Sequence, residues 1–320
     1  MQPMRIAVAD IGGTNARFAL AEVAGGKVVA LGEPVVLPAA RHAGLASAWQ
    51  AFAEALGHDL PRHAALAVAG PVIGGPVRFV NSGWVIDPDG IDAALGLDSH
   101  VLLNDFGAMA HAVHALPPEH FAALCGPDSP LPRRGTISVI GPGTGLGVAL
   151  LHRHASGPVV LETEGSHIHH APLDADEARV NAAIAARHGG RASVERIVSG
   201  PGLGEIVRAF APDDARDDAA LWAAAEAGDP GMAHALDLFM ACFGAAVGDL
   251  SLAHGSLGVA LAGGLVNRMR SHLVASRFHA RFCDKGRYRA RMEAVPITLV
   301  THPQPGLFGA AAAFARACQT

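Results

Sequence analysis

The stretch MRIAVADIGGTNARFAL, residues 4–20, decides how the first part of the chain folds. An apolar run ends at Asp10, the turn Gly12-Gly13-Thr14 follows, and a second apolar run begins immediately. Two apolar runs on either side of a Gly-rich turn predict a β-hairpin. A hairpin turn needs neither the carboxylate of Asp10 nor the hydroxyl of Thr14. A carboxylate that ends a buried strand costs free energy unless it has a partner. The turn therefore indicates a bound ligand.

The composition predicts a globular protein with a large hydrophobic core. The 320 residues are 50% hydrophobic and 17% charged, which suits one large domain or two ordinary ones and argues against disorder. A net charge of −5 disfavours nucleic acid or an anionic membrane as the main partner. The N-terminus has no signal-peptide pattern, the longest apolar run is interrupted by Asp249, and the four cysteines are scattered. We therefore expect a cytoplasmic protein with no membrane partner.

Patterns typical of strands and of helices alternate along the chain. Leu45, Trp49 and Phe52 share one helical face, for example. Gly57 stands where that helix is expected to end. Residues 118–135 are rich in proline and are predicted to form a loop. The mixture predicts an α/β fold in which helices cover mixed sheets.

A second strand–turn–strand pattern, SVIGPGTGLGVAL at residues 138–150, is of the same kind as the first. The similarity predicts a structural repeat, one copy in each half of the chain. Backbone N–H groups of Gly-rich turns can converge on an anion, and each threonine adds a hydroxyl donor. We expect the phosphates of ATP to bind between the two turns, with Mg²⁺ as the partner of Asp10. From the residues alone, two ordinary hairpins remain an alternative.

Other nucleotide-binding signatures are absent from the sequence. It contains no G-x-x-x-x-G-K-[ST] motif, and GPGTGLG does not have the G-x-G-x-x-G spacing. The letters DFG at residues 105–107 occur without the H-R-D and V-A-I-K elements of protein kinases. A P-loop enzyme and a protein kinase are therefore not expected.

Several polar side chains in Gly-rich or strand-end contexts suit a polyol ligand. Asn104 and Asp105 end an apolar strand, Glu164 and His167 flank a glycine, and Glu195 precedes a Gly-Pro-Gly loop. Carboxylates accept hydrogen bonds from neighbouring hydroxyls, and asparagine both donates and accepts. An Asn-Asp turn and a solvated surface charge remain the alternatives for these residues.

Three histidines, His167, His169 and His170, are clustered in the same segment. Neither H-E-x-x-H nor a Cys/His set with zinc spacing accompanies them, so a metal centre is not expected there. The sequence also has no G-x-S-x-G motif, which leaves hydrolase chemistry without support.

Six motifs in order resemble those of the bacterial ATP-dependent glucokinases: DIGGTNARFAL, NDFGAMA, GPGTGLGVA, EGSH, ERIVSGPGL and AGGL. The resemblance covers almost the whole chain. It implies membership of the hexokinase and actin-like ATPase superfamily, with two ribonuclease-H-like domains and the active site in the cleft between them. It further implies a small α/β domain of residues 1–107 plus 306–320 and a large α/β domain of residues 108–305.

The resemblance also implies roles for individual residues. Asp105 corresponds to the catalytic base of ATP-dependent glucose 6-phosphorylation, and the family is commonly dimeric. The positions that match sugar contacts are Asn104, Asp105, Glu164, His167 and Glu195. The positions that match the two phosphate turns are Gly12, Gly13, Thr14, Gly143, Thr144 and Gly145. Gly263 and Gly264 match the adenosine motif.

Two positions depart from the family pattern. Ser166 replaces a glycine, and His169 stands near a position that is often acidic. The departures leave open a kinase for another hexose, such as mannose or an N-acetylated hexosamine. A sugar-responsive regulator without catalysis is the other alternative. Such regulators carry a DNA-binding helix-turn-helix before the kinase-like core, and here the first strand is predicted to begin by about residue 4, so a regulator is not expected.

Overall fold

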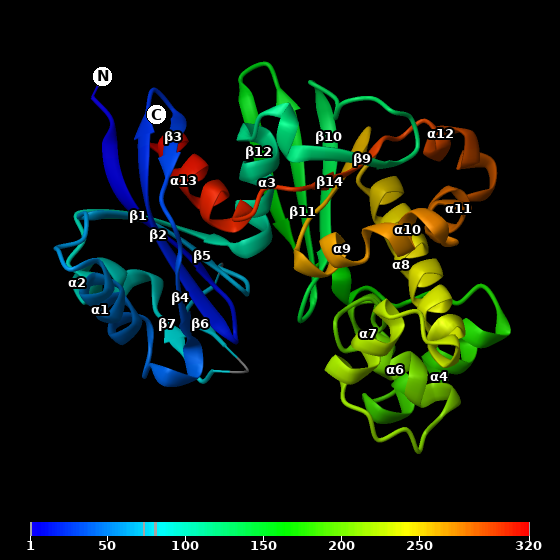
Figure 1. The fold of residues 1–320 in the computed structure, drawn as a ribbon. Coiled ribbons are helices and arrows are strands. Elements are labelled where there is room, and N and C mark those ends of the chain that lie inside the picture. The colour runs from blue at the N-terminus through cyan, green and yellow to red at the C-terminus, as the bar shows by residue number, and fades with distance from the viewer. Residues whose placement is uncertain (1, 73, 80–81, 320) are drawn as a thin grey trace. The chain divides into compact units, whose positions relative to one another are not determined.

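The computed structural model describes residues 2–72, 74–79 and 82–319, and it comprises two compact units. The first unit consists of Met1–Pro117, Val160–Glu162 and His302–Thr320, and the second consists of Pro118–Val159 and Thr163–Thr301. Figure 1 shows the α/β character that the sequence predicts. The first unit ends at residue 117 and resumes at residue 302, whereas the resemblance implied 107 and 306 for these two limits. The helix that begins at Asp105 lies in the first unit because it packs with the C-terminal helix.

The first unit is built on a mixed sheet with the strand order β3-β2-β1-β5-β8, in which β4 also pairs with β2. The predicted hairpin is present: β1 and β2 are antiparallel, whereas β1, β5 and β8 are parallel. A separate two-stranded sheet consists of β6 and β7. The strands are β1 (Met4–Ile11), β2 (Asn15–Ala24), β3 (Lys27–Leu31), β4 (Val35–Pro38), β5 (His63–Val68), β6 (Val77–Arg78), β7 (Val85–Ile86) and β8 (Ser99–Asn104).

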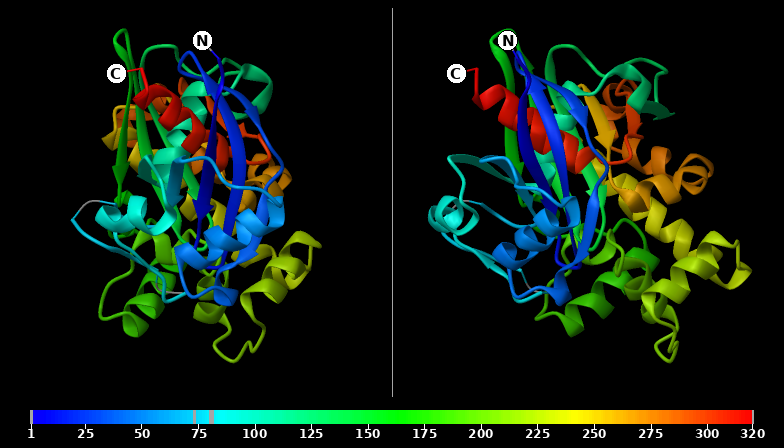
Figure 2. Two further views of the ribbon diagram at one scale, coloured as in Figure 1. Left: turned by 90° about the vertical axis from the view of Figure 1, so that its left-hand side faces the viewer. Right: turned by 60° about the vertical axis from the view of Figure 1, so that its left-hand side comes forward.

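Both faces of this sheet are covered, because alternate residues of β1 are buried on opposite sides. Ala7 and Ala9 pack in the cluster that contains Trp49 of helix α1, whereas Ile6 and Val8 pack in the cluster that contains helix α13. Figure 2 shows α13, in red, lying along the blue strands of the N-terminus. The helices of this unit are α1 (Leu45–Leu56), α2 (Ile91–Leu95), α3 (Asp105–Ala115) and α13 (Pro305–Ala317), with short 3-10 turns η1 (Ala39–Arg41) and η2 (Pro88–Gly90).

The second unit contains a mixed sheet with the strand order β12-β11-β10-β13-β14-β9. This sheet has the same arrangement as the sheet of the first unit: an antiparallel hairpin (β10 and β11) lies next to parallel strands (β13 and β14). The predicted repeat is therefore present in the topology. The strands are β9 (Phe121–Cys125), β10 (Gly135–Pro142), β11 (Leu146–His154), β12 (Gly157–Thr163), β13 (Gly258–Leu261) and β14 (Ile297–Val300). Within β12, Val160–Glu162 belong to the first unit.

The prediction of a loop throughout residues 118–135 is wrong in one place. The segment FAALC forms edge strand β9, which pairs antiparallel with β14. Prolines flank the segment without entering it, and an edge strand tolerates nearby prolines that a central strand would not.

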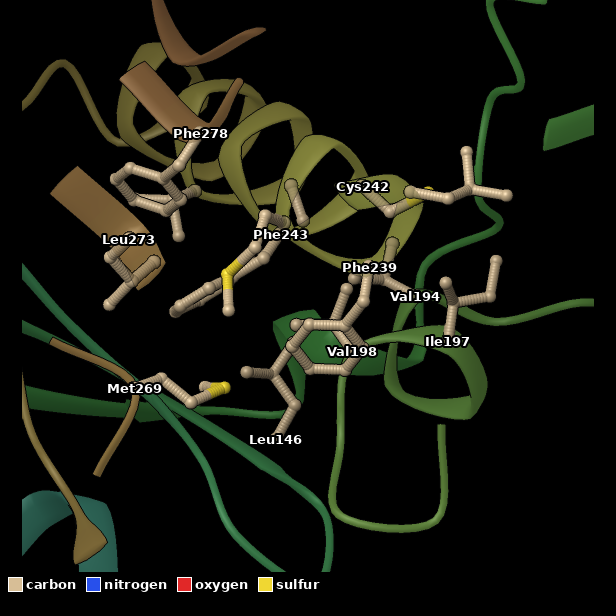
Figure 3. Packing of buried hydrophobic residues seen from close by; sticks show 14 of the residues in the cluster. Leu146, Val194, Ile197, Val198, Phe239, Cys242, Phe243, Met269, Leu273 and Phe278 are labelled. Carbon is tan, nitrogen blue, oxygen red and sulfur yellow. The ribbon is translucent and has the colours of Figure 1, made fainter. Parts of the chain in front are cut away.

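Helix α8 (Ala233–Ala253) is the centre of the hydrophobic core of the second unit. Figure 3 shows its Phe239 and Phe243 packed among side chains from other elements of this unit, including Ile197 and Phe278. With the preceding turn, the helical stretch Pro230–Ala253 is long and apolar enough to cross a membrane, but 78% of its most apolar window is buried in the protein. This burial is typical of a core helix.

The remaining helices of the second unit surround α8 and the sheet. They are α4 (Ala175–Arg187), α5 (Val194–Ile197), α6 (Gly202–Phe210), α7 (Asp218–Glu226), α8 (Ala233–Ala253), α9 (Gly264–Arg268), α10 (Arg270–Ala275), α11 (Phe278–Cys283) and α12 (Arg289–Glu293), with 3-10 turns η3 (Pro118–His120), η4 (Gly165–His167), η5 (Pro230–Met232) and η6 (Gly286–Tyr288).

Candidate functional site

The predicted phosphate turn and the predicted catalytic base lie at the same edge of the first unit's sheet. The register pairs Ile11 with Val68, and Val68 with Asn104, across three parallel strands. Since neighbouring strands are about 4.8 Å apart, Asn104 lies about 10 Å from the residue that precedes the Gly12-Gly13-Thr14 turn. Ligands of open α/β sheets bind at this carboxyl-terminal edge.

Asp10 has the surroundings expected of a carboxylate that binds a cation. Burial raises the pKa of its carboxyl group above the ordinary value, and Arg17, 3.7 Å away, only partly offsets this. The side chain is 21% exposed, so a ligand can still reach it. It lies against the first turn of α13, where a Cβ on Gly306 would be 2.8 Å from Oδ2. A carboxylate oxygen short of positive charge is a suitable donor for Mg²⁺.

Asn104 fixes the start of helix α3. Its side-chain Oδ1 accepts hydrogen bonds from the backbone N–H of Phe106 (2.9 Å) and of Gly107 (3.2 Å), which makes it the N-cap residue. Its Nδ2 donates to the backbone oxygen of Gly70 (3.1 Å). Asp105 is therefore the first residue of a capped helix, and its Oδ1 also accepts a hydrogen bond from Phe106 N–H. This arrangement holds the carboxylate in a fixed place.

A residue that the sequence analysis missed, Glu162, contacts this same cap. Its Oε1 accepts a hydrogen bond from the backbone N–H of Asn104 at 2.8 Å, and it fills the space that a side chain at Gly107 would take. Burial raises the pKa of Glu162, and the hydrogen bond from Asn104 lowers it in part. No local motif marks this residue, because its partner is 58 positions away in the sequence.

In the second unit, the turn Gly143-Thr144-Gly145 connects β10 to β11, as predicted. Gly143 N–H donates to the Gly145 oxygen (2.7 Å), and Gly200 N–H donates to the Gly143 oxygen (2.7 Å), so the Gly-Pro-Gly loop supports the turn. Glu195 lies directly beside it, because its Oε2 accepts a hydrogen bond from Leu146 N–H at 3.1 Å. A Cβ on Gly145 would be 2.4 Å from that oxygen. Glu195 is thus part of the surroundings of the turn, and not an isolated surface charge.

Gly263 and Gly264, predicted for adenosine, lie near the same turn. Gly263 ends the segment after β13 with φ of 110°, a conformation that favours glycine, and Gly264 begins helix α9. A Cβ on Gly263 would be 3.5 Å from the backbone oxygen of Pro142, the residue that precedes the turn. The second unit therefore brings both predicted nucleotide segments together.

Glu164 and His167 lie at the two ends of turn η4, with their side chains 3.6 Å apart and more than half exposed. The chain that follows η4 pairs with the chain that precedes Glu195, through a hydrogen bond from Val194 N–H to the Ile168 oxygen (3.0 Å) and an isolated bridge between His169 and Ser193. The structure thus places all three predicted sugar residues of this unit on two paired segments.

The three clustered histidines have different surroundings. His167 and His169 are exposed, but His170 is buried and its Nδ1 lies 2.8 Å from Oδ1 of Asn181. His170, Glu177 and Cys242 each place a ligand atom within 4.8 Å of the others. Arg281 is already paired with Glu177 at 2.8 Å, and its charge opposes a second cation there.

The comparisons with known proteins agree with this geometry. Two α/β units, each with a Gly/Thr turn on a hairpin, define the class of the actin-like ATPases. The glucokinase family model matches residues 7–317. A glucokinase of Zymomonas mobilis is 48% identical over 98% of each chain. The chain belongs to the glucokinase family and is an enzyme of that family.

Solved structures show the same fold. A glucokinase from an Antarctic psychrotroph superposes with a TM-score of 0.81 at 34% identity, covering 97% of this chain and 98% of its own. A glucokinase from Balamuthia mandrillaris in complex with glucose gives a TM-score of 0.80 at 21% identity, covering 98% of this chain and 94% of its own, which supports the fold alone.

Proposed function

We propose that this chain transfers the γ-phosphoryl group of ATP to the 6-hydroxyl of D-glucose. The observation that carries the proposal is the position of Asp105 at the carboxyl-terminal edge of the sheet, directly after Asn104, which lies about 10 Å from the residue that precedes the first Gly/Thr turn. Relatives that match over the full length and are named glucokinases favour glucose over another hexose and over a non-catalytic sensor.

In the proposed mechanism, Asp105 accepts the proton of the 6-hydroxyl as that oxygen attacks phosphorus. The carboxylate is suited to this role because the N-cap of Asn104 fixes its position before the sugar binds. Asn104, Glu164, His167 and Glu195 hold the hydroxyl groups of the ring, so that the reacting oxygen is in line with the phosphorus.

Charge on the transferring group is stabilised by the two turns. The backbone N–H groups and threonine hydroxyls of Gly12–Thr14 and Gly143–Gly145 donate to phosphate oxygens, and Gly263 and Gly264 leave room for adenosine. Asp10 would hold Mg²⁺, which offsets the negative charge of the phosphates. Because Arg17 compensates Asp10 only in part, a bound cation would stabilise the charged carboxylate there.

We further propose that the enzyme is a cytoplasmic homodimer whose product enters glycolysis. The resemblance to commonly dimeric glucokinases supports the dimer. Light scattering of the purified protein is expected to give twice the chain mass of 32.7 kDa, and the mass of a single chain would contradict the dimer.

Glu162 is expected to act as a positioning residue. Glu162→Ala removes the acceptor for Asn104 N–H, which loosens the start of α3, and we expect kcat to fall about tenfold with a smaller change in the KM for ATP. Glu162→Gln keeps an oxygen that can accept this hydrogen bond, so it should retain most of the activity. Glu33→Ala, an exposed site of the same unit, is the control. Equal losses of kcat in the alanine and glutamine variants would show that Glu162 does not act as the hydrogen-bond acceptor for Asn104 N–H.

Glu195 is expected to contribute mainly to sugar binding. Glu195→Gln keeps an acceptor for Leu146 N–H but loses the charge, so the turn should keep its shape. Losing one charge-assisted hydrogen bond is expected to raise the KM for glucose about tenfold, with a smaller effect on the KM for ATP. Steady-state kinetics with both substrates varied tests this, with exposed Glu119→Gln as the control. An unchanged KM for glucose would exclude Glu195 from the sugar site.

A further inference from the structure

A cavity lies within the first unit, near the end of α3 that is far from Asp105. It has a volume of about 340 Å³, at the small end of the range for small-molecule sites. Three elements enclose it: the turn between β2 and β3, the last turns of α3, and the side of α13. The lining residues are Gly26, Lys27, Val28, His111, His114, Ala115, Phe308, Ala312 and Arg316.

The lining of this cavity carries charge of one sign. Lys27, His111, His114 and Arg316 supply nitrogen groups from all three elements, and no Asp or Glu is among the described residues that line it. Phe308 and Ala312 supply an apolar wall. The four basic groups come from three widely separated parts of the sequence, so the fold, and not a local charge run, brings them together.

The pKa of His111 reflects both its burial and the positive charges near it. Its pKa is lowered to about 4, first by burial and then by the positive charges of Arg316 and His114. At neutral pH this imidazole is therefore uncharged. An anion bound among these groups would offset the repulsion and so raise the pKa of His111.

We propose that this cavity binds a small anion through a phosphate group. The planar guanidinium of Arg316 can donate two parallel hydrogen bonds to a phosphate, and Lys27 supplies a compact charge. Two imidazoles supply further donors, which matches the several acceptor oxygens of a phosphate better than the two of a carboxylate. The volume leaves room for an organic group beside the phosphate, against Phe308.

This site is distinct from the proposed catalytic one. His111 and His114 are six and nine residues after Asp105 on α3, or about 9 and 14 Å along the helix axis. The carbonyl end of α3 opposes an anion, and the basic side chains of its last turns act against that field. An anion bound here would contact the far end of the helix that carries Asp105.

The test uses nuclear magnetic resonance of the histidine ring protons in the full-length enzyme. Inorganic phosphate, pyrophosphate and glycerol 2-phosphate are titrated separately at millimolar concentrations. We expect shifts of the His111 and His114 signals and a rise in the pKa of His111. By linkage, the contribution of His111 to the affinity should increase as the pH falls through its raised pKa in the bound state towards about 4, because binding takes up a proton there. If only glycerol 2-phosphate binds, the ligand is an organic phosphate. If all three anions bind, the site recognises the phosphate group itself.

Variants locate the binding. Arg316→Gln is expected to weaken pyrophosphate binding at least about tenfold, because one charge-assisted contact is lost. Lys27→Gln, at an exposed turn, should weaken it without risk to folding, and exposed Arg5→Gln of the same unit should not change it. Basal kinase activity should be unchanged in both cavity variants. The proposal is overturned if none of the three anions moves the His111 signal in the wild type, or if both cavity variants bind as the wild type does.

Discussion

Replacing Asp105 with asparagine is expected to lower kcat by about 10²–10⁴-fold, the range in which general bases contribute. The substitution changes the charge but little of the shape, and the asparagine oxygen can still accept the hydrogen bond from Phe106 N–H. The start of α3 should therefore remain intact, because its cap is Asn104 and not Asp105. The loss should fall on the chemical step, with only a small change in the KM for glucose.

The measurement for Asp105→Asn is steady-state production of ADP with glucose, together with the midpoint of urea unfolding. Asp89→Asn, an exposed carboxylate of the same unit, is the matched control and should match the wild type. A variant with wild-type kcat would remove Asp105 from its role as base. A variant that fails to fold would show that the carboxylate is structural.

Gly309→Ala is expected to destabilise the first unit by about 3 kcal/mol, at the upper end of overpacking costs. A Cβ at this position would be 1.8 Å from the backbone oxygen of Ala108, so helices α13 and α3 would have to separate. Alanine favours a helix over glycine by about 1 kcal/mol, which is too little to offset the clash. Because α3 carries Asp105, activity should also fall.

Urea unfolding followed by fluorescence and circular dichroism measures this effect. Gly90→Ala is the matched control, since its Cβ would meet only ordinary contacts of 3.9 Å or more and its φ of −95° suits any residue. We expect the control to stay within about 0.5 kcal/mol of the wild type. Equal stability of the two variants would show that the contact between α3 and α13 can relax.

The fold class could be predicted from the sequence because local signals were strong. The turn at Gly12–Thr14 lies between two strands, and the helix predicted from Leu45 ends at Gly57, which has a φ of 69°. Strand β9 could not be predicted, because it is stabilised by pairing with β14, more than 170 residues later. The boundaries of the first unit depend in the same way on the packing of α13 against α3.

The site was predictable where a residue belongs to a compact motif. Asn104 and Asp105 follow a strand directly, and the structure adds that Asn104 is a helix cap. Glu162 was not predictable, because its hydrogen bond to Asn104 N–H joins distant segments. The histidine cluster was interpreted as one feature, but only His167 and His169 are exposed, since His170 turns into the core towards Asn181. Ser166 is buried as well.

The most direct test of the central claim is the rate of ADP formation with glucose, compared with mannose and N-acetylglucosamine at equal concentration, and the position of the phosphate in the product. The proposal predicts the highest kcat/KM for glucose, a 6-phosphate product and a strict need for ATP and a divalent cation. A higher kcat/KM for another hexose, or ADP release that no sugar stimulates, would contradict it.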